Sequence, residues 1–289
     1  MSGGRKRSLR LSGLIFLAGA LFAAPVSAAP KRVMSLNLCT DQLAMSLAQP
    51  EQLVSVSFLA REPTLSTLHE KAQAYPVNRG LAEEVFLEKP DLVVTGTYSL
   101  HNTTALLKRL GFRVEEFSFV QTLDTIPDEI RRMGALLGQE EKAEKLADDF
   151  SQELDQIASR QCGIRPTIIA YDQNGIASGN GTLADSVMQA AGFDNLAADL
   201  GVNGMAPFPL EQVVAARPDV IVTSASEGAP TLGEYVPRHP AIAALPDTHI
   251  GPFVPAGAWS CGSPAVIDAV RALASLRAEI APCPQDATQ

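Results

Sequence analysis

The sequence is acidic: its 289 residues carry a net charge of −9, and the isoelectric point is near 5.0. This balance argues against nucleic acid and against an anionic membrane surface as partners. A hydrophobic content of 46% with 19% charged residues is typical of an ordered globular protein.

Residues 1–28 are predicted to be a cleaved signal peptide. Basic residues between Arg5 and Arg10 precede an apolar stretch at residues 11–24, and small residues before position 29 suit a cleavage site. Cys39 does not lie in a lipobox after that stretch, so a lipid anchor is not expected. The mature chain is therefore predicted to be exported and soluble.

The first half of the mature chain alternates strand and helix patterns. Strands are predicted at residues 33–36, 53–56, 92–94 and 113–117, with helices at 43–48 and 103–110 and a further helix before the third strand. Such alternation indicates a mostly parallel α/β sheet. We assign residues 29–121 to an N-terminal lobe.

One segment of the chain occurs twice. Glu83 stands seven positions before Pro90-Asp91 and a buried strand, and Glu211 stands at the same distance before Pro218-Asp219 and another. In each copy, apolar residues at helical spacing indicate a short helix feeding a strand covered on both faces. Two copies far apart in the chain predict two similar lobes with a cleft between them.

Apolar residues recur near the helical period from Thr125 to about Arg160, with a possible break at Gly138. We assign residues 122–161 to a bridging helix and residues 162–289 to a C-terminal lobe. In that lobe, a strand is predicted at residues 167–171 and helices at 183–190 and 264–280. The expected fold is two Rossmann-like α/β lobes joined by one long bridging helix.

Four cysteines in an exported chain without a Cys-x-x-Cys pair predict disulfides rather than a zinc site. Cys162 opens the second lobe and Cys283 follows its last helix, so a bridge between them would staple the C-terminus. Cys39 and Cys261 are then expected at the cleft from opposite lobes. They either form a bridge across it or line it as small buried residues.

The chain resembles the periplasmic substrate-binding proteins of class III ABC importers, which carry vitamin B12, ferric siderophores or haem. The resemblance rests on three features: the N-terminal segment Arg32-Val-Met-Ser-Leu36, the paired Glu…Pro-Asp segments, and the helical segment at residues 130–144. It implies a monomeric periplasmic protein that delivers a metal chelate to an inner-membrane ABC permease, without a cofactor or catalytic residues. It also implies that Glu83 and Glu211 dock on the permease and that the bridging helix limits closure.

Ligands of open α/β sheets bind beyond the carboxyl ends of the strands, which selects loops from both lobes as cleft walls. The candidate ligand-binding residues in these loops are Asn37, Cys39, Arg61, Tyr98, His101, Asn174, Ser226, Trp259 and Ser260. Trp259 is expected to stack on the ligand, and Arg61 to hold an anionic group. Among cargoes, a ferric siderophore is ranked first, cobalamin second and haem third.

Three other functions compete with this interpretation. A zinc or manganese importer protein shares the two-lobed shape, but its site needs converging His and carboxylate ligands, and the four histidines here are scattered. An exported thiol hydrolase would use Cys39 as its nucleophile, and oxidation of that cysteine would exclude it. A sensor with the same lobes would have no role in uptake.

Overall fold

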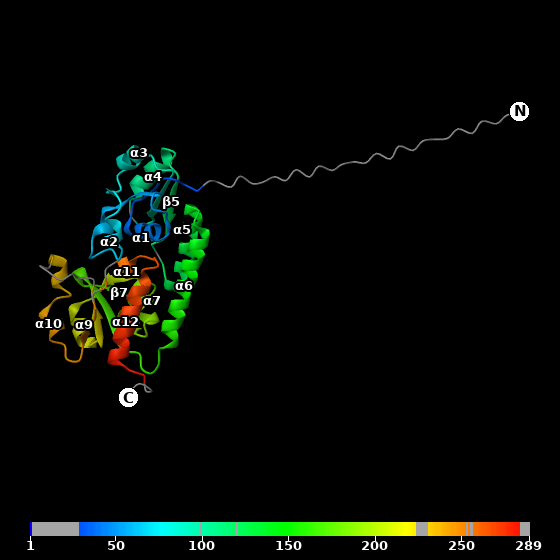
Figure 1. Ribbon diagram of the computed structural model, residues 1–289. Helices are drawn as coiled ribbons and strands as arrows, with labels where there is room; N and C mark the ends of the chain where they lie inside the picture. The colour runs from blue at the N-terminus through cyan, green and yellow to red at the C-terminus, as the bar shows by residue number, and fades with distance from the viewer. Residues whose placement is uncertain are drawn as a thin grey trace.

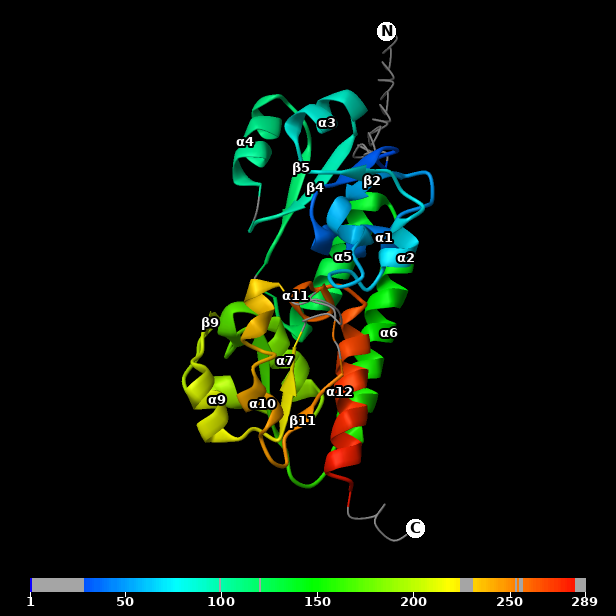
Figure 2. The same cartoon turned by 90° about the vertical axis from the view of Figure 1, so that its left-hand side faces the viewer.

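The computed structural model describes Met1 and residues 29–283, except for residues 99, 120, 224–230, 253 and 255–256. The chain forms two α/β lobes stacked end to end, with one long helix running beside both (Figures 1 and 2). The predicted signal peptide and Ser226 lie outside the described residues. Within the described ranges, no helix is long and apolar enough to cross a membrane.

The N-terminal lobe is a parallel sheet with strand order β3-β2-β1-β4-β5. Its strands are β1 (Val33–Ser35), β2 (Leu53–Ser57), β3 (Val77–Asn78), β4 (Leu92–Gly96) and β5 (Val114–Phe117). Its helices are α1 (Leu38–Leu47), the 3-10 turn η1 (Phe58–Arg61), α2 (His69–Ala72), α3 (Ala82–Glu88) and α4 (His101–Arg109). The predicted edge strand is β5.

The aspartate of the repeated Pro-Asp segment makes equivalent hydrogen bonds in the two lobes. Asp91 Oδ2 accepts hydrogen bonds from the backbone N–H groups of Lys31 and Arg32, at the start of β1. Asp219 Oδ2 likewise accepts from the N–H and the hydroxyl of Thr167, at the start of the corresponding strand of the other lobe. Each aspartate therefore ties the central strand of its lobe to the strand that follows the repeat helix.

The segment between the lobes is a pair of helices rather than one long helix. A 3-10 turn, η2 (Leu123–Thr125), leads into α5 (Ile126–Leu137), and α6 (Glu140–Ser159) follows after a sharp turn. Gly138 makes this turn at φ 67°, a left-handed conformation that glycine adopts without steric cost. The two helices then pack antiparallel, which the ion pairs of Arg131 in α5 with Glu144 and Asp148 in α6 show.

Helix α6 is the element that joins the lobes. Lys142, in its first turn, donates to the carbonyl of Leu47 in the N-terminal lobe. Glu153, farther along, pairs with Arg271 on the last helix of the C-terminal lobe. One hydrophobic cluster contains both Val33 of β1 and Val270 of that last helix. A continuous core therefore crosses from one lobe to the other.

The C-terminal lobe has a mixed sheet with order β11-β10-β6-β7-β9, and β8 also pairs with β6. Its strands are β6 (Thr167–Asp172), β7 (Ile176–Ser178), β8 (Asp194–Asn195), β9 (Met205–Pro207), β10 (Val220–Val222) and β11 (His249–Ile250). Its helices and 3-10 turns are η3 (Gln173–Gly175), α7 (Leu183–Ala190), α8 (Leu196–Asp199), α9 (Leu210–Ala216), η4 (Leu232–Tyr235), α10 (Pro240–Ala243), α11 (Gly257–Ser260) and α12 (Val266–Ile280). The antiparallel pairs β6–β7 and β7–β9 were not predicted, because both added strands are short and lack an apolar run.

Candidate functional site

Two adjoining cavities lie between the lobes, where strands of the N-terminal sheet end near α11. Phe119, Gln121 and Ser260 line both of them. The first is otherwise lined from the N-terminal lobe, by Asn37, Cys39, Thr40, Leu43, Gly96, Tyr98, Phe117 and Ser118. The second, of about 140 Å³, is otherwise lined from the C-terminal lobe, by Ser178, Gly181, Thr182, Leu183, Ala184, Gly204, Met205 and Trp259. The site is thus built from both lobes, as the cleft rule requires.

Asn37 and Cys39 were predicted to lie in a loop, but they belong instead to the cap and first turn of α1. The side chain of Asn37 accepts hydrogen bonds from the N–H groups of Cys39 and Thr40, both at 3.1 Å. This is a standard N-cap, and it fixes the direction in which α1 leaves the sheet. Asn37 and Cys39 therefore reach the first cavity as rigid groups rather than as loop residues.

The structure contains the disulfide predicted between Cys162 and Cys283, and a second one between Cys39 and Cys261. Of the two alternatives for Cys39 and Cys261, the bridge is the one observed. It joins α1 of one lobe to the turn between α11 and α12 of the other. A disulfide sulfur is not a nucleophilic thiol, so the hydrolase alternative that relied on Cys39 is wrong for the oxidised chain.

Backbone hydrogen bonds accompany this bridge. The N–H of Gly262 donates to Gln121 Oε1 at 2.7 Å, and the N–H of Gly257 donates to the carbonyl of Leu65 at 2.7 Å. Gln42 donates in turn to the carbonyl of Gly257. The lobes are therefore held together at the cleft by one covalent and several polar contacts.

An aromatic pair stands at the mouth of the cleft. The rings of Tyr98 and Phe119 are stacked, with centroids 4.6 Å apart and planes inclined by 27°. Tyr98 is 68% exposed, although it lies next to a buried strand. A stacked and partly exposed pair presents a flat apolar surface with a phenol group at its edge.

Trp259 does not stack freely in the cleft, contrary to the prediction. It is 3% exposed and belongs to the hydrophobic core that joins the lobes. The Gly/Ser-rich segment around it forms the helical turn α11, which packs against α7 and α12. Only part of the indole reaches the second cavity, so Trp259 forms a wall of the site rather than a stacking platform.

Other predicted site residues are not brought to the cavities. Arg61 donates to the carbonyls of Ala72 and Tyr75, so its guanidinium holds the N-terminal lobe together. His101 is the exposed first residue of α4, and Asn174 lies exposed in η3 beside Gly233. Neither lines the two cavities described above.

Several lining residues were missed by sequence reasoning. Phe119 and Gln121 follow the end of β5, and the strand-end rule would have found them had that loop been included. Ser178 and Thr182 flank the turn after β7, a strand that the sequence did not reveal. Met205 begins β9, which was missed for the same reason.

The described residues that line the two cavities include no Lys, Arg, His, Asp or Glu. The phenol of Tyr98 is among their polar groups. Hydroxyl and amide groups supply the polarity. Asp41 lies near this lining but inside the N-terminal lobe, fully buried against Ser57. Burial raises its pKa to about 7, against the opposing effect of its hydrogen bonds to Ser35 and Ser57.

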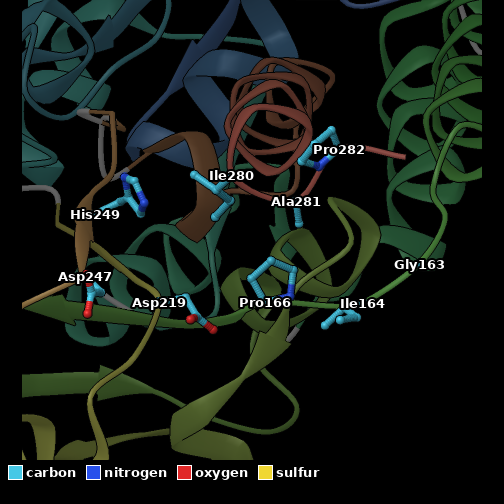
Figure 3. A pocket seen from close by; sticks show the side chains of 9 residues that line it. All are labelled: Gly163, Ile164, Pro166, Asp219, Asp247, His249, Ile280, Ala281 and Pro282. Carbon is cyan, nitrogen blue, oxygen red and sulfur yellow. The ribbon is translucent and has the colours of Figure 1, made fainter. Parts of the chain in front are cut away.

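Larger cavities lie at the other end of the C-terminal lobe, where β6, β10 and β11 begin. One of about 460 Å³ is lined by Pro166, Asp219, His249 and Ile280, among others (Figure 3). Ligands of open α/β sheets bind at the opposite edge, beyond the carboxyl ends of the strands. Position in the sheet therefore argues against this cavity as the principal site.

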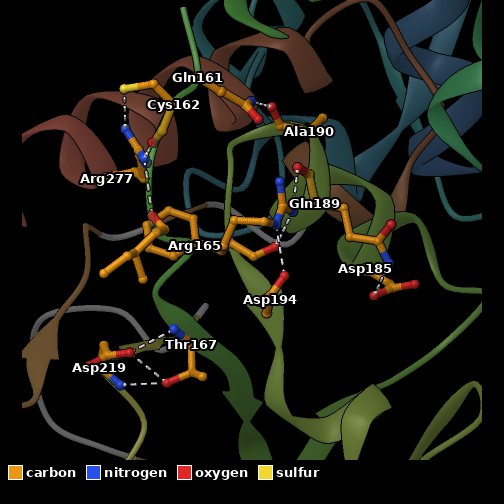
Figure 4. A network of polar contacts seen from close by, with 12 residues as sticks. Gln161, Cys162, Arg165, Thr167, Asp185, Gln189, Ala190, Asp194, Asp219 and Arg277 are labelled. Atoms are coloured by element: carbon orange, nitrogen blue, oxygen red, sulfur yellow. Dashed lines mark hydrogen bonds and ion pairs between the residues drawn. The ribbon is translucent and has the colours of Figure 1, made fainter. Parts of the chain in front are cut away.

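The polar groups at that end bind one another (Figure 4). Arg165 donates to Asp194 Oδ1 at 2.7 Å, and Arg277 donates to the carbonyls of Cys162 and Ile164. These contacts fasten the entry of the chain into the lobe. No group of His, Cys, Asp and Glu suited to a metal ion occurs among the described residues, so the free-metal alternative gains no support.

The two repeat glutamates are both exposed, each at the second position of its helix, α3 or α9. Both helices end in a left-handed residue, Lys89 at φ 47° and Arg217 at φ 49°. The backbone N–H of each cap residue donates to the carbonyl of the buried valine one turn earlier, Val85 in α3 and Val213 in α9. The sequence repeat is therefore also a structural repeat.

The family model of the periplasmic binding proteins matches residues 33–247. The chain belongs to this family. This periplasmic binding protein is 27% identical to the vitamin B12-binding protein of Pectobacterium carotovorum over 74% of its own length and 78% of the relative's. It is also 27% identical to a cobalamin-binding protein of Halobacterium salinarum over 68% of its own length, and there it spans about half of the relative, 54%.

Solved structures share the fold of this periplasmic binding protein. The periplasmic heme-binding protein RhuT from Roseiflexus sp. RS-1 superimposes with a TM-score of 0.72 at 22% identity, covering 86% of this chain and 98% of that one. The periplasmic vitamin B12-binding protein BtuF of Vibrio cholerae gives 0.64 at 22% identity, with 87% and 98% covered. The predicted two-lobed α/β fold is confirmed, and these relatives are binding proteins.

Proposed function

We propose that this protein captures a corrinoid of the cobalamin type in its inter-lobe cleft, in the periplasm, and delivers it to an inner-membrane ABC importer. The observation that carries the proposal is that the described residues lining the cleft are uncharged, with the stacked Tyr98–Phe119 pair at its mouth. This reverses the order of cargoes favoured by the sequence, which placed a ferric siderophore first.

The chemistry of the candidate ligands separates them at such a lining. A corrin presents a broad conjugated face and is ringed by neutral amide groups. Aromatic rings contact the first, and hydroxyl and amide groups such as those of Asn37, Gln121 and Thr182 match the second. Haem carries propionates and catecholate siderophores are strongly anionic, so both call for cationic groups that the described lining lacks.

The curated relatives support the same choice, since their names describe vitamin B12-binding or cobalamin-binding proteins. Haem is the second candidate, because the exposed phenol of Tyr98 is a group that ligates ferric iron. The cavities are smaller than the roughly 300–1,000 Å³ of typical ligand pockets. A corrinoid would therefore rest against the mouth of the cleft and remain partly open to solvent.

Delivery to an importer rests on different observations. The basic and apolar pattern of residues 1–28 favours export to the periplasm. The exposed Glu83 and Glu211 occupy the same position on the repeat helix of each lobe. One carboxylate on each lobe gives a two-point contact that orients the protein on a cationic partner. Such exposed charges raise the association rate more than the affinity.

Calorimetric titration of the mature protein with cyanocobalamin, haemin and a ferric hydroxamate siderophore tests the ligand. We expect tight binding of cyanocobalamin alone, weakened about tenfold or more in Tyr98→Ala and in Phe119→Ala, because stacking contributes on the order of 1 kcal/mol beyond buried area. Phe86→Ala, which removes an exposed aromatic ring outside the cleft, serves as the matched control. Preferential binding of haemin, or full affinity in both cleft variants, would reject the corrinoid site.

A further inference from the structure

Helix α3 exposes large apolar side chains that the fold does not use. Phe86 is 58% exposed and Leu87 78%, and Leu81 at the start of the helix is 50% exposed. On the inward face of the helix, Val85 is fully buried and packs against the sheet. Removing such side chains from water would be favourable, so their exposure calls for an explanation outside the folded chain.

Two of these side chains lie beside Glu83. Phe86 and Leu87 follow it by three and four residues, and residues at these spacings are neighbours on one helix face. Glu84 belongs to a different environment, because its carboxylate accepts hydrogen bonds from the N–H groups of Arg79 and Leu81. Glu83 is exposed and has no hydrogen bond or ion pair with any residue that the structure describes.

The second copy of the repeat provides an internal control. Helix α9 has the same buried valine, the same left-handed cap and the same exposed glutamate. At the positions of Phe86 and Leu87 it carries Val214 and Ala215, which are smaller. The architecture of the repeat therefore does not require a large exposed aromatic or aliphatic residue at these positions.

We propose that Phe86 and Leu87, with the carboxylate of Glu83, form an apolar docking face that seats in a depression beside a cation on the periplasmic surface of the importer. The proposal rests on the proposed delivery function and deepens it: the N-terminal lobe supplies an apolar anchor, whereas Glu211 on the other lobe supplies charge alone. A partner that contacts both lobes explains why the exposed glutamate recurs on α9. A second copy of this chain bound through α3 alone would leave that recurrence unexplained.

The decisive variant is Phe86→Ser/Leu87→Ser in the full-length protein, tested for uptake of labelled cyanocobalamin by cells that lack the wild-type protein. We expect uptake to fall about tenfold or more, as for the loss of a buried aromatic anchor, with unchanged melting temperature and unchanged calorimetric affinity for cyanocobalamin. The matched control is Ile164→Ser/Leu200→Ser, which removes comparably exposed side chains from the other lobe. Wild-type uptake in the decisive variant would overturn the proposal.

A second readout does not depend on the cargo. A photo-crosslinker placed at Leu87 is expected to join the protein to an inner-membrane importer permease in cells, and one placed at Leu200 is not. A crosslink between two copies of this chain, with a dimer in sedimentation that Phe86→Ser/Leu87→Ser abolishes, would overturn the proposal in favour of self-association. If the wild type neither binds cyanocobalamin nor supports its uptake, the proposed cargo fails, and the permease crosslink alone decides the docking face.

Discussion

Cys39, in the first turn of α1, is covalently bonded to Cys261, which follows α11 in the other lobe. The two residues are 222 positions apart in the sequence, and their bond lies at the edge of the cavity that Cys39 lines. The two lobes are thus joined covalently beside that cavity. This bond therefore ties the N-terminal end of α1 in one lobe to the segment after α11 in the other.

Removal of this bond is expected to loosen the lobes. We expect Cys39→Ser/Cys261→Ser to increase amide hydrogen exchange at α11 and in the first turn of α1, and to broaden the distribution of spin-label distances between the lobes. Cys162→Ser/Cys283→Ser is the matched control, because its loop of 121 residues gives a similar chain-entropy contribution, on the order of 5 kcal/mol. Equal broadening in both variants would show that the inter-lobe bond has no special role.

The buried carboxyl of Asp41 predicts a dependence of stability on pH. Its pKa is raised from 3.8 to about 7, so the folded state holds the proton more tightly than the unfolded state. The stabilising effect is therefore complete below about pH 4 and is lost as the pH rises through about 7. The total is on the order of 4 kcal/mol.

Asp41→Asn removes this titration while keeping a neutral side chain of the same shape. The free energy of unfolding of the variant, relative to the wild type, is expected to rise between roughly pH 4 and pH 8. Urea unfolding at a series of pH values measures it. Asp124→Asn, at an exposed position, serves as the control, and a constant difference for Asp41→Asn across this range would contradict the assignment.

Docking through the repeat glutamates predicts a separation of uptake from binding. We expect Glu83→Ala/Glu211→Ala to lose importer-dependent uptake while its calorimetric affinity for the ligand is unchanged, because neither residue lines the cavities. Glu84→Ala tests a neighbouring carboxylate that caps α3, and it should lower stability without the same loss of uptake. Normal uptake by the double variant would exclude docking through these residues.

The close packing of α5 on α6 predicts an unusual effect of alanine. A Cβ added at Gly134 would lie 2.1 Å from the Cβ of Ala143, which is far inside van der Waals contact. Gly134→Ala should therefore destabilise by about 1–3 kcal/mol, although alanine favours helices. Thermal unfolding measures the loss, and the added substitution Ala143→Gly should recover part of it; a stabilised Gly134→Ala would show that the helices can move apart.

Sequence patterns predicted the parts of this fold that depend on local apolar order. The fully buried runs of β4 and β10 were readable because continuous aliphatic residues report a strand covered on both faces. A break at Gly138 was predicted, but the reversal of chain direction there was not. Apolar periodicity does not report the angle between two helices that a glycine separates. The packing of α5 on α6, its neighbour in the chain, decided that outcome.

The candidate site was less predictable for a related reason. Trp259 looked like a ligand contact because Gly and Ser surround it, yet those small residues let α11 pack closely and bury the indole. Arg61 looked like an anion ligand, but nearby carbonyls satisfy it. Cys39 was predicted at the cleft because it follows β1, and it lines the first cavity, whereas Ser178 depended on a strand that only tertiary pairing creates.

The anchoring of α6 to both lobes constrains how this molecule can move. A body attached to another at two separate places turns only about the line through them. With α6 as one attachment and the Cys39–Cys261 bond as the other, a rotation about the line through them leaves both in place, and the shared core and cleft hydrogen bonds keep it small. Cargo exchange would then proceed by a small twist about that hinge line, and a partner that grips both lobes could drive it by applying torque.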